Sequence, residues 1–166
     1  TVQSTKAFLS TETARVVIDS AEVSGDMLEL DVIVQSLSGH KLPTAYPSRR
    51  AWLHVRVHSQ DGEAIFESGQ LNPDGSIAGN DNDENGTSFE PHYTVIERTD
   101  QVQIYESILV DYQDRVTTGL LSGVSYVKDN RLLPRGFEKA SASWEVAVHG
   151  GALEDSDFIS GGDRVH

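Results

Sequence analysis

An irregular segment at residues 37–54 carries the side chains of this chain that are best suited to chemistry. His40 follows a glycine there, and two prolines stiffen the backbone after it by fixing φ. Arg49 and Arg50 then place two permanent cations just before an apolar run. The segment therefore offers one imidazole beside two guanidinium groups.

Two histidines lie in irregular stretches, where a side chain can point away from the fold. His40 follows a glycine and His92 follows a proline. Neutral imidazole is a good axial ligand for haem iron, so either histidine could serve a haem that a neighbouring domain carries. A structural role is the more common outcome for such residues, and the sequence leaves both roles open. The spacing of the six histidines matches no zinc-binding motif.

A second candidate site lies in an acidic loop. Residues 81–86 match the opening of a calcium loop, in which carboxylate and amide oxygens alternate before a glycine. The twelfth position is a histidine instead of the glutamate that an EF-hand needs. The loop therefore predicts a looser calcium site, or else a solvated acidic loop without metal. The ligands of that calcium site would be Asp74, Asn80, Asp81 and Asp83.

The elements that position these groups are predicted to be strands. Alternating apolar residues with many β-branched side chains predict strands at 14–23, 27–34, 51–57, 64–66, 102–110 and 143–148. Turn signals separate the early strands, residues 71–91 form a long loop, and one helical turn is expected at 138–142. We expect a single all-β domain over residues 1–166: an antiparallel β-sandwich, immunoglobulin-like or jelly-roll-like, with long loops.

Composition excludes several classes of function. The chain has no cysteine, so it cannot carry a covalently attached c-type haem, a thiolate zinc site or a cysteine nucleophile. A net charge of −13 argues against nucleic acid as a partner. No apolar run is long enough to span a membrane, and no phosphate-binding loop or serine nucleophile motif appears. We do not expect this chain alone to be an enzyme.

Several short motifs resemble the cysteine-free C-terminal β-domain of some bacterial multihaem c-type cytochromes. The first is the sequence Gly-His-Lys-Leu-Pro-Thr at residues 39–44, followed by Pro-Ser-Arg-Arg-Ala-Trp-Leu-His-Val at 47–55. Further similar motifs follow in the same order at residues 72–77, 90–93, 102–106 and 128–137. The resemblance spans residues 28–165. An alternating pattern begins again at 163–166, so we expect the chain to be a C-terminal fragment of a longer protein.

The resemblance implies a role in electron transfer. It implies a non-catalytic accessory domain of an exported cytochrome, periplasmic, extracellular or on the cell surface, that packs on a haem-bearing domain of the same chain or on a partner cytochrome. Haem c would be contacted only through that neighbour. His40 would supply an axial ligand or touch the haem edge, and Arg49 or Arg50 would pair with haem propionates. Calcium would stabilise the domain.

A different class of function stays open. The expected sandwich, the oxygen-rich loop and aromatic residues such as Tyr46 and Trp52 are also typical of a calcium-dependent module that binds a polysaccharide or another surface. Loss of polysaccharide affinity on mutation of either aromatic residue would favour this alternative. An enzyme with a site of its own ranks last.

Overall fold

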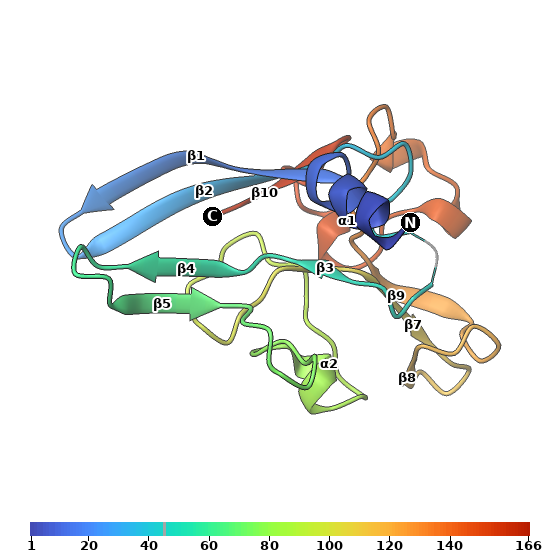
Figure 1. Ribbon diagram of the computed structural model, residues 1–166. Coiled ribbons are helices and arrows are strands. Elements are labelled where there is room, and N and C mark those ends of the chain that lie inside the picture. Colours follow the sequence, from blue (N-terminus) through green and yellow to red (C-terminus); the bar gives the residue numbers. More distant parts are fainter. Residues whose placement is uncertain (45) are drawn as a thin grey trace.

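Antiparallel strands dominate the computed structural model, which describes residues 1–44 and 46–166 (Figure 1). The first sheet has the order β1-β2-β10, and a second has the order β8-β7-β9. Two strand pairs, β3–β6 and β4–β5, complete the described strands, and none of these sheets closes on itself. The strands are β1 (Ala14–Ser24), β2 (Met27–Ser36), β3 (Ala51–Trp52), β4 (Val55–His58), β5 (Ala64–Ser68), β6 (Ile104–Tyr105), β7 (Ser107–Val110), β8 (Val116–Thr117), β9 (Ser125–Asp129) and β10 (Gly162–Val165).

The prediction of an all-β fold is confirmed, with differences in detail. The helical elements are α1 (Val2–Thr11), α2 (Asp81–Glu84) and the 3₁₀ turns η1 (Lys139–Ser141), η2 (Trp144–Val146) and η3 (Gly151–Leu153). The turn η1 matches the one expected at 138–142, whereas α1 was not expected. The predicted strand at 143–148 is wrong, because its alternation reflects only one buried residue, Val148, while Trp144 and Val146 are exposed on η2.

The longest pairing joins β1 to β2 through a turn at Gly25, whose φ of 62° suits glycine. The register shifts between Ile18 and Ser20, where β1 carries one extra residue as a bulge. Along β2, the alternate residues at 28, 30, 32 and 34 share a face, as the pattern predicted. Val34 at one end of that face is buried, while Leu28 at the other end is 40% exposed. This face of β2 is therefore buried in the core near Val34 and exposed to solvent near Leu28.

The core lies at the inner ends of the strands. Its main cluster joins buried residues of β2, β6, β10 and the loops between them, and a smaller cluster surrounds Val102 and Ile104. Trp52 packs on the smaller cluster and donates from Nε1 to the carbonyl of Gly69 at 2.9 Å. Away from the core, the β1–β2 and β4–β5 hairpins project in the same direction (Figure 1). The main cluster consists of Val34, Leu53, Tyr105, Leu132, Leu133, Val148, Ala152, Phe158 and Val165.

Candidate functional site

The segment at residues 37–44 is fixed to the fold just after its histidine. Leu42 exchanges backbone hydrogen bonds with Leu132, at 2.9 and 2.8 Å. Lys41 donates from Nζ to Asp129 Oδ2 and to a backbone carbonyl, both at 2.8 Å. Burial lowers the pKa of Lys41, although the carboxylate of Asp129 opposes this shift. The backbone beside His40 is therefore anchored while the His40 residue itself is exposed.

The tautomer of His40 follows from one hydrogen bond. Its Nδ1 lies 3.0 Å from the carbonyl oxygen of Lys41. A carbonyl oxygen only accepts, so in the neutral ring Nδ1 carries the proton and Nε2 keeps its lone pair. Among the residues that the structure describes, none makes a hydrogen bond to this Nε2. Metal-binding histidines commonly donate one ring N–H to a backbone carbonyl and bind the metal with the other nitrogen. His40 thus presents an exposed nitrogen in the state that a metal requires.

Two other exposed histidines, His58 and His54, differ in how far they share this state. His58 has the same tautomer, because its Nδ1 lies 3.2 Å from the carbonyl oxygen of Gly62 on the β4–β5 hairpin. His54 uses Nε2 to contact Glu67 at 2.8 Å. The tautomer alone therefore does not distinguish His40 from His58. Only the surroundings of the two histidines can distinguish them.

A cationic hollow lies beside the backbone that precedes His40, although His40 itself does not line it. Its volume is about 270 Å³, and it is lined by Arg135 and by residues 36–39, which lead directly into the histidine. Within the described part of the chain, the guanidinium group of Arg135 makes no hydrogen bond or ion pair. An arginine beside a hollow is well suited to a carboxylate, which it can bind in a bidentate manner. This arrangement could not be predicted from the sequence, because Arg135 is remote from residues 36–39 along the chain.

Arg49 and Arg50, the two arginines predicted to contact haem propionates, differ in how many contacts they make within the chain. Arg49 is exposed, and among the described residues its guanidinium group donates only to the carbonyl oxygen of Thr44, at 3.3 Å. Arg50 pairs with Asp83 Oδ1 at 2.7 Å and donates to the carbonyl oxygen of Gly75 at 3.2 Å. The structure therefore ties Arg50 to the acidic loop, whereas Arg49 keeps most of its donors in solvent.

The acidic loop satisfies most of its own oxygens. Asp74 Oδ1 accepts hydrogen bonds from the backbone N–H and the hydroxyl of a serine two residues on, at 3.0 and 2.7 Å. Asn80 caps α2 with its side-chain oxygen. Asp83 Oδ2 accepts a hydrogen bond from a backbone N–H at 2.8 Å, and its Oδ1 pairs with Arg50. Burial acts to raise the pKa of Asp83, but these hydrogen bonds outweigh it and the pKa is lowered overall. Asp81 is exposed at the start of α2. Calcium binding by these four residues stays a prediction.

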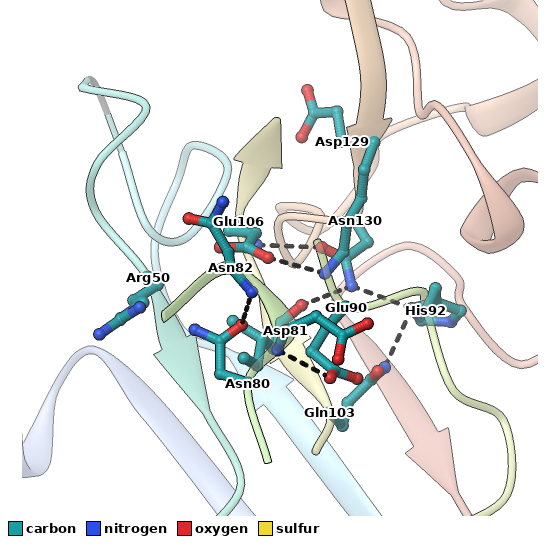
Figure 2. A network of polar contacts seen from close by, with 12 residues as sticks. Arg50, Asn80, Asp81, Asn82, Glu90, His92, Gln103, Glu106, Asp129 and Asn130 are labelled. Atoms are coloured by element: carbon teal, nitrogen blue, oxygen red, sulfur yellow. Dashed lines mark hydrogen bonds and ion pairs between the residues drawn. The ribbon is translucent and has the colours of Figure 1, made fainter. Parts of the chain in front are cut away.

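His92 lies inside a polar network (Figure 2). Its side chain has no exposed surface, and its Nε2 lies 2.9 Å from Asp155 Oδ2. The amide nitrogens of Gln103 and Asn130 lie 2.9 and 3.1 Å from its Nδ1. Both amides are oriented by backbone N–H groups that donate to their oxygens. Nδ1 must therefore accept, so the proton sits on Nε2 and is donated to Asp155.

The same network contains the one group of three acidic or histidine ligands that the described residues bring together. One ligand atom each of His92, Asp155 and Asp163 lie within 4.8 Å of one another. Asp163 is 2% exposed with Oδ1 unpartnered, and burial raises its pKa. A metal on Nε2 would move the proton of His92 to Nδ1, where two amide N–H groups already point. This donor set does not suit a metal, and an enclosed ring presents no nitrogen to an outside haem.

Comparison with known proteins gives no match, since no family model, no curated protein and no solved structure shows significant similarity to the chain. None of the helices in the described residues has the length and apolar character needed to cross a lipid bilayer.

Proposed function

We propose that this chain is a non-catalytic accessory domain of an exported multihaem c-type cytochrome. It would support electron transfer in the periplasm or at the cell surface by packing on a haem-bearing domain of the same chain or of a partner cytochrome. The observation that carries the proposal is the state of His40, an exposed imidazole with a free Nε2 on an anchored segment. Such a nitrogen can ligate a haem iron or touch the haem edge.

The surroundings of His40 support the same role. A haem carries two propionates, and an exposed cation beside the ligand would bind one of them. Arg135 lines a hollow together with residues 36–39, which immediately precede His40. Arg49 lies further along the loop, and among the described residues its guanidinium group contacts only the carbonyl oxygen of Thr44. We therefore assign the propionate contact to Arg135 or Arg49 and no longer to Arg50, which Asp83 holds.

The arrangement of the strands fits a docking module. We propose that the two β layers form an open sandwich, with the β1-β2-β10 sheet over the β4–β5 hairpin (Figure 1). Anchoring contacts at Lys41 and Leu42 fix the His40 segment to the β9 end of this structure. The rigid part of the domain would then hold the ligand, and the haem would come from the neighbour.

Titration with a haem c peptide that has one open axial position tests this function. Wild-type protein should convert the haem to a low-spin form, which is visible as a shift of the Soret band. His40→Ala should weaken binding at least about tenfold, because the ligand nitrogen is lost. Arg135→Ala should weaken it about two- to fivefold, as expected for an exposed ion pair.

His58→Ala is the matched control, because His58 is an exposed histidine with the same tautomer but another location. It should bind the peptide as wild type does. Unchanged binding by His40→Ala, or a loss of binding in His58→Ala alone, would contradict the proposal.

A polysaccharide-binding module is the second candidate, and one observation favours it. The His149 ring stacks on Tyr126 and meets the edge of Trp144, with ring centroids 5.6 and 5.8 Å apart. Trp144 is 58% exposed, so this aromatic group reaches solvent, unlike Trp52, which packs on the core. Affinity electrophoresis in polysaccharide gels should show retardation that Trp144→Ala removes if this function is the true one.

A further inference from the structure

Glu90 carries a buried carboxylate oxygen that none of the described residues satisfies. The residue is 1% exposed, and its Oε1 accepts the backbone N–H of Asp81 at 3.1 Å. Its Oε2 has no hydrogen-bond partner in the described part of the chain. Burial raises the pKa of Glu90, although its present contacts oppose the shift. A buried carboxylate oxygen without a donor is costly, so a group that offsets its charge would stabilise the fold.

Asp81 supplies a second carboxylate beside Glu90 (Figure 2). Its charge acts to raise the pKa of Glu90. Burial raises the pKa of Tyr93, and the carboxylates of Glu90 and Asp81 raise it further, so the phenol of Tyr93 lies near both. Asp74 and Asp83 use their oxygens in hydrogen bonds, whereas the Asp81 carboxylate makes no hydrogen bond or ion pair with the described residues. Two carboxylates with unused oxygens therefore lie together, one buried and one exposed.

Lys128 cannot neutralise these carboxylates alone. Its Nζ pairs with Glu106 Oε1 at 2.9 Å, and its charge also acts on Glu90. One lysine therefore serves two buried carboxylates, and Asp81 adds a third negative charge at the surface. The group keeps an excess of two negative charges, which a divalent cation would balance.

We propose that Glu90 and Asp81 form a calcium site, with Glu90 Oε2 and the Asp81 carboxylate as its anionic ligands. Calcium prefers oxygen ligands, tolerates irregular geometry and fills the rest of its about six to eight positions with water or carbonyl oxygens. The exposed side of Asp81 gives the ion a path from solvent. The sequence predicted Asp81 as a ligand, but with residues 74, 80 and 83 instead of Glu90. This inference does not depend on the proposed haem contact.

Terbium luminescence and thermal unfolding test the proposal. Tb³⁺ substitutes for calcium and emits when a nearby aromatic ring transfers energy to it, and Tyr93 lies near both carboxylates. Emission should rise as Tb³⁺ is added and fall when calcium competes. Calcium at about 100 times its dissociation constant should raise the thermal midpoint of wild type by about 5–10 °C, because it binds only the folded state.

Glu90→Gln removes the charge and keeps the shape of the side chain. Without calcium it should be at least as stable as wild type, because a buried charge is lost. With calcium its midpoint should not rise, and Tb³⁺ should bind at least about tenfold more weakly. Asp81→Asn should also weaken Tb³⁺ binding about tenfold, and because Asp81 is exposed this variant keeps the test valid if Glu90→Gln does not fold. Glu84→Gln changes another exposed carboxylate of α2, so it is the matched control and should bind as wild type.

Three outcomes would overturn the proposal. The first is the absence of calcium and Tb³⁺ binding, which would leave Glu90 hydrated or protonated. The second is equal binding by Glu90→Gln and wild type. The third is a loss of binding in Asp74→Asn but not in Glu90→Gln, which would favour the four ligands predicted from the sequence. Each of these results leaves the haem titration of His40 independent.

Discussion

The buried ion pair between Lys128 and Glu106 gives the sharpest stability prediction. Lys128 Nζ lies 2.9 Å from Glu106 Oε1, and the two side chains are only 1% and 6% exposed. Burial lowers the pKa of Lys128, and the carboxylate of Glu106 opposes the shift. Since β9 carries Lys128 next to Asp129, which anchors Lys41, the pair also supports the His40 segment.

Lys128→Met should remove the cation and leave a buried carboxylate without a partner. Breaking a buried pair in this way costs about 3–5 kcal/mol of unfolding free energy, which is a large share of the stability of a domain of this size. Glu106→Leu should cost a similar amount by leaving the ammonium group unpaired. The double variant should lose less than about 2 kcal/mol, because two apolar side chains replace the whole pair.

Urea unfolding followed by tryptophan fluorescence measures all three variants, and the chain has two tryptophans to report on it. The double-mutant cycle should give a coupling free energy of several kcal/mol. A loss below about 1 kcal/mol in Lys128→Met, or strictly additive losses, would contradict this prediction, because either result would show that the pair contributes no more than an exposed pair does.

Three further predictions concern a carboxyl, a glycine and an anchor. Burial raises the pKa of Asp163, so the folded state binds its proton more tightly than the unfolded state, and this carboxyl lowers stability as pH rises through its folded pKa. The unfolding free energy of Asp163→Asn minus that of wild type, measured by urea unfolding, should therefore be larger in neutral than in mildly acidic buffer. The opposite trend would show that the buried carboxyl does not destabilise the fold when it is ionised. Gly69→Ala should lower unfolding free energy by about 2 kcal/mol or more, because Gly69 has a φ of 77° and its new Cβ would clash with the carbonyl oxygen of Leu53; a thermal midpoint equal to wild type would contradict this. Lys41→Met should weaken haem c peptide binding while His40 is intact, because its contact with Asp129 is lost; unchanged hydrogen exchange at residues 37–44 would show that Lys41 is no anchor.

The sequence predicted the long hairpin well and the short elements poorly. Both strands of that hairpin, β1 and β2, alternate over many residues around a Gly25 turn, so a local pattern determines them. The alternation at 143–148 had the same appearance, but none of the described strands pairs with that stretch, which contains η2 instead. Pairing depends on distant residues, which a local pattern does not contain.

In the candidate site too, features that depend on neighbouring residues could be predicted, and features that depend on distant residues could not. That His40 lies on an exposed, irregular segment could be predicted from glycine and proline nearby, and the structure agrees. The enclosure of His92 could not, because its partners Asp155, Gln103 and Asn130 come from three separate segments. The position of Arg135 could not be predicted for the same reason, since only the folded chain brings it to the hollow lined by residues 36–39.

The most direct test of the account is the state of the His40 ring itself. Long-range ¹H–¹⁵N correlation spectra distinguish the two neutral tautomers of each histidine, and a paramagnetic ferric haem c peptide broadens the resonances of its ligand. We expect a proton on Nδ1 of His40 in the free protein and selective loss of the His40 signals when the peptide is added. A proton on Nε2, or a haem-bound state in which the His40 signals persist, would contradict the central claim.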